Sequence, residues 1–219
     1  MKCTMLAQQG ASTLAVFFTG WGMDARPFAR IGQSAHVRHC DVALCYDYTD
    51  MQLPLPACSG YAAVQVWAWS LGVYAASVVL AAANLPITRA VAINGTLFPV
   101  DDTRGIPTAT YDATLRALTG EAAASVLERF TRRMCGRYYA DFTAHMPARS
   151  LTSLRDELAA VKAHAATRQS RPYTAWNLAV LSRKDRIFPI ANLRRAWADT
   201  PRIELDEPHY LPDLPFVGE

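Results

Sequence analysis

The sequence predicts an α/β fold with a mostly parallel, doubly wound sheet. Short runs rich in β-branched and aromatic residues recur along the chain, and helical stretches separate them. The run over residues 62–69 is apolar at nearly every position, which is typical of a strand covered on both faces. The 219 residues suffice for one domain with a sizeable core. Strands that alternate with helices in this way indicate parallel strands joined by helical crossovers.

The first half of the chain supplies five of the predicted elements. The segment STLAVFFTG, residues 12–20, predicts a strand, and the stretch after it can open a helix at Asp24. A second strand is predicted within HCDVALCYDY, residues 39–48. No charged residue occurs from Cys58 to Arg89, a length that could cross a bilayer as one helix. Ser70 interrupts this run and no basic or aromatic flanks support a membrane span, so we expect a strand over 62–69 and a helix over 73–86.

The second half of the chain begins with a predicted strand in ITRAVAING, residues 87–95. Residues 97–170 carry long helical patterns without a strand signal. A strand in YTAWNLAVLSRKD (173–185), a helix starting near Pro189 and a last strand over 202–205 then follow. We therefore expect a core formed by residues 1–96 and 171–219, with residues 97–170 as a helical lid insertion.

Composition narrows the class of protein. The 22 Lys and Arg residues against 19 Asp and Glu leave a net charge of +3, too balanced to indicate nucleic acid as the main partner. The N-terminal segment MKCTMLAQQGAS lacks the apolar stretch of a secretory signal, so we expect a cytoplasmic protein, with a monomer favoured. Five scattered cysteines without a CxxC pair indicate thiols rather than a disulfide framework. The group His36, His39, Cys40 and Cys45 resembles a set of metal ligands but also fits a half-buried strand, so we expect no metal site.

The segment Ala68-Trp69-Ser70-Leu71-Gly72 has the form small-x-Ser-x-Gly between a predicted strand and a predicted helix. This is the pattern of a nucleophile elbow, in which a strained turn exposes the serine hydroxyl. Small residues two positions before and after the serine allow the strand and helix backbones to pass close together. Ala68 stands where the pattern usually has glycine. Ser70 is therefore the candidate nucleophile.

A serine nucleophile needs a base and an orienting carboxylate, which in α/β-hydrolases follow in the order Ser, acid, His. Asp185 follows LAVL (178–181), the apolar run of the strand predicted within 173–185. His209 follows the last predicted strand. Taken singly, Asp185 could cap a turn and His209 could be a loop histidine held by Asp206 or Glu207. The rival acids Asp101 and Asp102 follow the strand at 87–95, and the remaining histidines precede the serine or lie in the insertion.

An oxyanion formed at Ser70 would need two hydrogen-bond donors. The elbow supplies the backbone N–H of Leu71. The second donor is expected from the segment TGWGMD, where Gly20 and Gly22 let the backbone approach the serine and the N–H of Trp21 could face the oxyanion. Alternatively, TGWGMD could be a simple glycine turn before a helix, which fits the local sequence equally well.

Several motifs together resemble a known family. FFTGWGMD, WAWSLGVYAA, AINGT followed by GIP between Asn94 and Pro107, and a late PHY are similar to the pimeloyl-[acyl-carrier protein] methyl ester esterases of the BioG type. The resemblance covers nearly the whole chain and is weakest in the insertion. It implies hydrolysis of a methyl ester on a pimeloyl chain carried by acyl-carrier protein, in biotin synthesis, with release of methanol and without a cofactor.

The predicted insertion offers a surface for such a carrier. Arg129, Arg132, Arg133 and Arg137 recur at helical spacing close to one face, and acyl-carrier proteins are acidic. Alternatively, these arginines could lie on a solvated helix face and pair with the nearby acids Glu128 and Asp141. Two other functions stay open: a general short-chain carboxylesterase or acyl thioesterase with the same triad, and a catalytically silent α/β-hydrolase that serves as a binding module.

Overall fold

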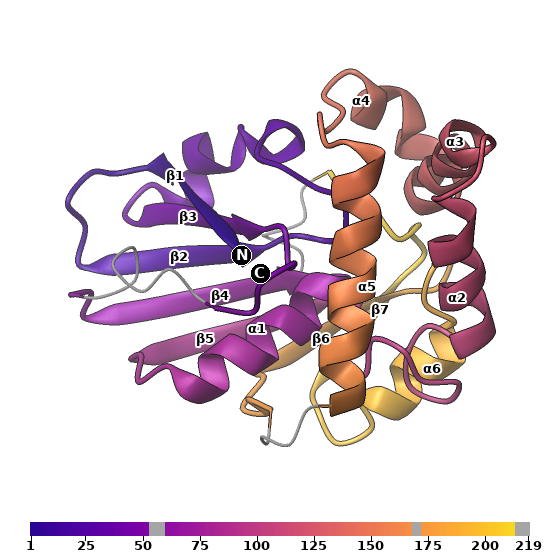
Figure 1. Ribbon diagram of the computed structural model, residues 1–219. Coiled ribbons are helices and arrows are strands. Elements are labelled where there is room, and N and C mark those ends of the chain that lie inside the picture. The colour runs from indigo at the N-terminus through magenta and orange to yellow at the C-terminus, as the bar shows by residue number, and fades with distance from the viewer. Residues whose placement is uncertain (53–59, 168–171, 213–219) are drawn as a thin grey trace.

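The computed structural model describes residues 1–52, 60–167 and 172–212, and its centre is a seven-stranded sheet (Figure 1). The strands are β1 Lys2–Ala7, β2 Thr13–Phe18, β3 Asp41–Tyr46, β4 Ala63–Trp69, β5 Ile87–Ile93, β6 Leu178–Ser182 and β7 Arg202–Leu205. Their order in space is β1, β3, β2, β4, β5, β6, β7, and β1 alone is antiparallel to its neighbour. The predicted mostly parallel, doubly wound sheet is confirmed.

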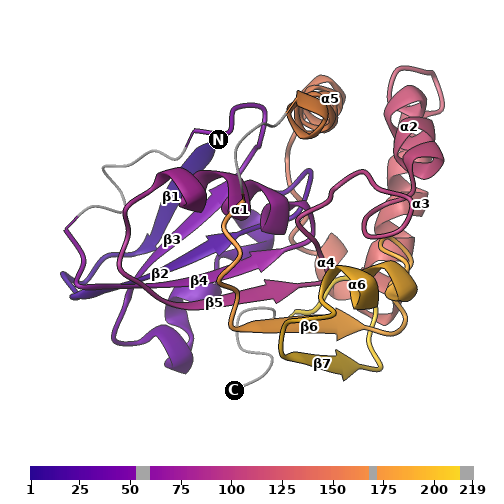
Figure 2. The same ribbon diagram turned by 90° about the horizontal axis from the view of Figure 1, so that it is seen from below.

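The centre of the sheet explains the long uncharged run in the sequence. Strand β4 lies between β2 and β5, and helix α1, Leu71–Ala82, begins directly after Ser70 and covers one face of the sheet (Figure 2). Both the strand and the helix are largely buried, so neither needs charged residues. No helix within the described ranges is long and apolar enough to span a membrane. Cys58, which lies within the uncharged run, is outside the described residues.

Two features of the first 40 residues differ from the prediction. The helix expected at Asp24 is wrong: the chain instead forms three short 3₁₀ segments, η1 Arg26–Phe28, η2 Ile31–Gln33 and η3 Ala35–Val37. Gly32 interrupts any longer helix and packs so closely that a Cβ there would lie 2.8 Å from the carbonyl oxygen of Leu6. The edge strand β1 was not predicted, because its side chains are only partly buried and give a weak pattern.

Residues between β5 and β6 form helices, as the sequence predicts. They are α2 Thr108–Ala117, α3 Ala123–Cys135, the 3₁₀ segment η5 Gly136–Tyr138, α4 Tyr139–Thr143 and α5 Leu151–Thr167. A further helix, α6 Ile190–Ala196, connects β6 to β7. Figures 1 and 2 show α2, α3 and α4 gathered at one end of the sheet, with α5 beside them. This is the end at which β4 terminates and Ser70 follows, so the inserted helices stand over the candidate nucleophile.

Candidate active site

The turn between β4 and α1 holds Ser70 in an unusual backbone conformation. Its φ is 58° and its ψ is −130°, a region that non-glycine residues rarely occupy and that costs on the order of 1–3 kcal/mol. Two glycines make room for this turn. A Cβ on Gly72 would lie 2.3 Å from the carbonyl oxygen of Thr19, and one on Gly95 would lie 2.1 Å from the carbonyl oxygen of Ser70. The close backbone approach expected at an elbow is therefore present, and Ala68 fits into it with 1% exposure.

Three side chains form a continuous hydrogen-bonded chain. Nδ1 of His209 lies 2.7 Å from Oδ2 of Asp185, and Nε2 lies 2.9 Å from Oγ of Ser70. Because the carboxylate only accepts, the neutral imidazole donates through Nδ1 and accepts the serine proton at Nε2. The other Asp185 oxygen accepts from the backbone N–H of Ile187 (2.7 Å) and Phe188 (2.9 Å), which fixes the carboxylate. The structure thus brings Ser70, Asp185 and His209 together in a Ser-His-Asp arrangement.

The loop that carries His209 is held by groups the sequence analysis did not single out. Its carbonyl oxygen accepts from Asn94 Nδ2 at 2.8 Å and from Trp69 Nε1 at 3.0 Å. The ring of Phe188 stacks on the imidazole with centroids 5.9 Å apart. Asn94 also accepts from the backbone N–H of Ser182, so it ties the end of β6 to the histidine loop. An asparagine directly after a buried strand and before a glycine is the signal that could have indicated this role.

The rival acids lie elsewhere and have other partners. Asp101 accepts from the backbone N–H groups of Thr103 and Arg104 at 2.9 and 2.8 Å, and Asp102 accepts from that of Thr108 at 2.7 Å. Both carboxylates therefore cap turns before α2. Their hydrogen bonds within the described residues do not reach the histidine of the triad.

The acids beside the histidine loop are also engaged away from the imidazole. Asp206 pairs with Lys184 at 2.6 Å, and Glu207 pairs with Arg137 and accepts from the hydroxyl of Tyr138. In the described part of the chain, His, Cys, Asp and Glu side chains form no group of three or more that could hold a metal ion.

The two candidate oxyanion donors line the same pocket as the serine. Trp21 and Leu71 both border the cavity that contains Ser70. Within the described ranges, neither backbone N–H donates a hydrogen bond to the protein. Gly20 lies against the elbow, where a Cβ would come within 3.1 Å of the Ser70 Cβ. Unsatisfied donors beside a serine hydroxyl are what an oxyanion hole requires.

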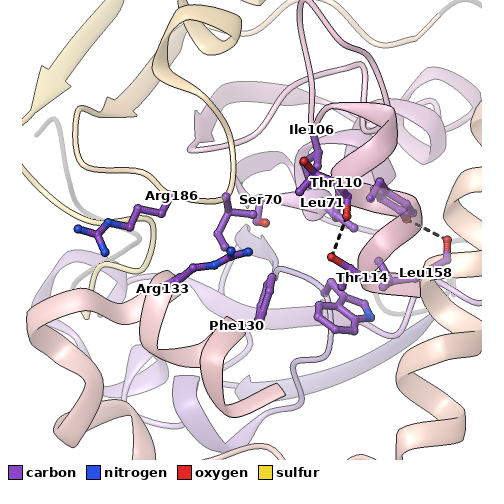
Figure 3. Close-up of a pocket in the computed structure, with 12 residues that line it drawn as sticks. Ser70, Leu71, Ile106, Thr110, Thr114, Phe130, Arg133, Leu158 and Arg186 are labelled. Carbon is purple, nitrogen blue, oxygen red and sulfur yellow. Dashed lines mark hydrogen bonds between the residues drawn. The ribbon is translucent and has the colours of Figure 1, made fainter. Parts of the chain in front are cut away.

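The pocket above Ser70 has about 470 Å³ of empty space, part of it open to solvent (Figure 3). Its walls come from the elbow, from all three long inserted helices and from the loop after β6. The lining residues are Trp21, Ser70, Leu71, Ile106, Thr110, Tyr111, Thr114, Phe130, Arg133, Leu158, Arg186 and Ile187. Most of these side chains are apolar, and two arginines stand among them. The pocket therefore suits a substrate with an apolar chain next to the reacting carbonyl.

Two of the four predicted carrier-binding arginines are already paired. Arg132 forms an ion pair with Glu128 at 2.7 Å and stacks over the ring of Tyr139 at 4.3 Å. Arg137 pairs with Glu207. These two guanidinium groups are therefore less available to an acidic partner.

The other two arginines border an open groove. Arg129 and Arg133 line an open hollow between α2 and α3 with about 910 Å³ of empty space, part of it open to solvent, and Arg133 also borders the pocket above Ser70. Arg129 makes one long hydrogen bond, 3.3 Å to Ser125 Oγ, and Arg133 has no hydrogen bond or ion pair with the residues that the structure describes. Arg186, which the sequence analysis did not name, also lines the pocket; in Figure 3 its guanidinium points away from Ser70.

Comparison with known proteins assigns the chain to a family. The model of the family described as pimeloyl-ACP methyl esterase BioG matches residues 1–215. The crystal structure of BioG from Haemophilus influenzae superimposes with a TM-score of 0.82 at 31% identity, over 97% of this chain and 95% of that one. An esterase from Exiguobacterium antarcticum shares the fold, with a TM-score of 0.67 at 12% identity over 94% and 87% of the two chains.

A curated relative of this chain is named as a methyltransferase rather than an esterase. A malonyl-[acyl-carrier protein] O-methyltransferase from Bacteroides fragilis is 39% identical over 184 residues, which are 83% of this chain. The match spans only 36% of that protein, so most of the relative has no counterpart here. The family match over nearly the whole length, the BioG structure and the α/β-hydrolase fold agree with one another. This chain therefore belongs to the pimeloyl-ACP methyl esterase BioG family.

Proposed function

We propose that this chain hydrolyses the methyl ester of pimeloyl-[acyl-carrier protein] methyl ester, a step in biotin synthesis, and releases methanol. The observation that carries the proposal is the hydrogen-bonded chain Asp185–His209–Ser70 at the base of an apolar pocket, in a member of the BioG family. The name of the methyltransferase relative supports it, because that protein acts on a carrier-linked acyl group. Removal of a methyl group from such a chain is the chemical complement of its addition.

The triad geometry allows a two-step ester hydrolysis. Ser70 Oγ attacks the ester carbonyl while its proton passes to Nε2 of His209, and Asp185 stabilises the imidazolium through Nδ1. The tetrahedral oxyanion lies against the N–H groups of Trp21 and Leu71. Collapse breaks the bond to the methoxy group, which leaves as methanol with the proton from His209.

The second half of the reaction restores the serine. His209 takes a proton from water, and the resulting hydroxide attacks the acyl-enzyme carbonyl. The bond to Ser70 Oγ breaks, the serine regains its proton from His209, and the free carboxyl end of the chain is released. The thioester that joins the acyl chain to the carrier takes no part in either step.

The groove between α2 and α3 supports a carrier-linked substrate. It shares Thr110, Thr114, Phe130 and Arg133 with the pocket above Ser70, so the two hollows are neighbours. Its walls also include Ala113. An acyl chain whose ester end lies at Ser70 can leave along this apolar groove. The inserted helices then act as a lid over the chain, and the arginines of the groove face the acidic carrier.

Reversing the charge of Arg129 and Arg133 together, as Arg129→Glu and Arg133→Glu, tests this docking route. We expect KM for the carrier-linked ester to rise by roughly tenfold or more at low ionic strength, because attraction to the acidic carrier becomes repulsion. The difference from wild type should shrink as salt is added. KM for a short free ester should change by less than about twofold, because it needs no carrier contact. Steady-state kinetics on both substrates measure these effects.

A matched control carries the same change of charge outside the groove. Arg30→Glu with Arg38→Glu alters two exposed arginines in turns beside the short helical segments between β2 and β3. If this control raises KM for the carrier-linked ester as much as the groove variant does, the effect is one of net charge and the docking route is wrong. The docking route is also wrong if the groove variant slows only the short ester.

A further inference from the structure

A buried charged cluster joins the inserted helix α5 to the loop that carries the proposed oxyanion donor. Glu157 is fully buried on α5 and pairs with Arg149 at 2.6 Å. Arg149 in turn pairs with Asp47 at 2.9 Å, and its own side chain is only 7% exposed. A buried carboxylate is costly unless it is paired and hydrogen-bonded, so the contacts of Glu157 show what this cluster holds in place.

Each oxygen of Glu157 binds a different loop. Oε1 accepts from the backbone N–H of Tyr48 at 3.0 Å, after β3. Oε2 accepts from the backbone N–H of Gly22 at 3.1 Å, 135 positions away in the sequence. Gly22 belongs to the segment 19–23, which we term the oxyanion loop because it contains Trp21. One carboxylate thus links α5 to the oxyanion loop and to the loop after β3.

A second bond from the same helix fixes the other side of the donor residue. Nε1 of Trp21 donates to the carbonyl oxygen of Leu154 at 2.8 Å, one turn before Glu157 on α5. Trp21 is therefore anchored by its side chain and by the peptide that follows it. Gly22 has a φ of 75° and lies so close to Leu154 that a Cβ would be 3.0 Å from its Cδ2. These contacts leave the backbone of the oxyanion loop little freedom to move.

The charge state of Glu157 matters for this contact. Burial raises the pKa of its carboxyl group, and the Arg149 guanidinium and the N–H groups of Tyr48 and Gly22 partly offset that rise. As a carboxylate, the group accepts at both oxygens. A glutamine at this position keeps the shape of the side chain, but its NH₂ group would face either the N–H of Tyr48 or the N–H of Gly22 and the Arg149 guanidinium. Two donors cannot bond to each other, so at least one of these contacts is lost.

We propose that Glu157 is a positioning residue that, from α5, holds the backbone N–H of Trp21 towards the oxyanion formed at Ser70. This inference rests on the proposed ester hydrolysis. It makes helix α5 part of the catalytic geometry, although α5 supplies none of the reacting groups. Because an oxyanion forms only in the transition state, the contribution of Glu157 is to kcat rather than to binding of the substrate.

The test compares Glu157→Gln with wild type on a short p-nitrophenyl ester, which needs no carrier. We expect kcat to fall by about 10- to 100-fold while KM stays within about twofold. A trifluoromethyl ketone that forms a tetrahedral adduct with Ser70 should lose affinity by a similar factor. A role in stability alone would lower the unfolding temperature and leave kcat and the affinity for this ketone unchanged.

Asp47→Asn is the matched control, because it removes the other ion pair of Arg149 and keeps both Glu157 oxygens and the backbone N–H groups that they bind. It should lower the unfolding temperature and keep kcat within about twofold of wild type, since Arg149 can still bind Glu157. If Asp47→Asn lowers kcat as much as Glu157→Gln does, or if Glu157→Gln keeps wild-type kcat, the proposal is overturned.

If Glu157→Gln does not fold, Trp21→Phe removes the other anchor, the bond to Leu154, and should also lower kcat and the affinity for the ketone. Wild-type kcat and ketone affinity in that variant would overturn the proposal. If the wild-type protein hydrolyses the short ester but not the carrier-linked ester, the proposed substrate is wrong. The role of Glu157 is then still decided by kcat on the short ester.

Discussion

Replacing Ser70 with alanine should lower kcat for ester hydrolysis by about 10⁵-fold, with little change in the binding of substrate. The hydroxyl oxygen lies 2.9 Å from Nε2 of His209, in a strained turn that exposes it to the pocket. Without it, no acyl-enzyme can form, and only water attack assisted by the oxyanion donors remains. Steady-state kinetics and labelling by a serine-directed phosphonate both measure this loss, and the variant should take up no label.

Ser77→Ala is the matched control for that experiment. Ser77 is a fully buried serine on helix α1, which begins directly after Ser70. Its hydroxyl donates to the carbonyl oxygens of Val73 and Tyr74 rather than to the triad. Its loss should leave kcat within about twofold of wild type and cost about 1 kcal/mol of stability. If Ser70→Ala retains wild-type turnover, or if phosphonate labels the variant, Ser70 is not the nucleophile.

Asp185→Asn should lower kcat by about 10³- to 10⁴-fold while the fold stays intact. The amide oxygen can still accept from the N–H groups of Ile187 and Phe188, so the amide NH₂ would face Nδ1 of His209. The imidazole then accepts at Nδ1 and carries its proton on Nε2, where it can no longer take the proton of Ser70. The kinetics of the variant on a short ester measure the effect.

Asp101→Asn and Asp102→Asn separate this role from that of the rival acids. Both side chains cap turns before α2, so each substitution should change stability slightly and kcat by less than about twofold. If either of them lowers kcat as much as Asp185→Asn does, the assignment of the orienting acid is wrong.

The sequence was most informative where chemistry depends on order along the chain. Ser70, Asp185 and His209 each follow a strand of the parallel part of the sheet, and parallel strands bring their carboxyl ends to one edge, so their meeting could be predicted. Gly72 could likewise be predicted to lie at a close backbone approach, because the elbow motif requires a small residue there.

The parts that escaped prediction depend on contacts between distant segments. Glu157 lies in a helix that reads as an ordinary amphipathic stretch, and only the folded chain shows that it reaches Gly22. The position of Asn94 between a buried strand and a glycine suggests a structural role, but only the folded chain shows that its amide holds the loop of His209, 115 positions later. Periodicity reports which face of an element is buried but not which distant loop a polar side chain meets.

The bond that is broken in the carrier-linked substrate tests the central claim most directly. The enzyme is incubated with pimeloyl-[acyl-carrier protein] methyl ester, and the intact mass of the carrier protein and the methanol formed are measured together. We expect methanol in step with a carrier that has lost the mass of one methylene group and keeps its acyl chain. A carrier stripped of its acyl chain, with monomethyl pimelate in solution, would show thioester cleavage and contradict the account.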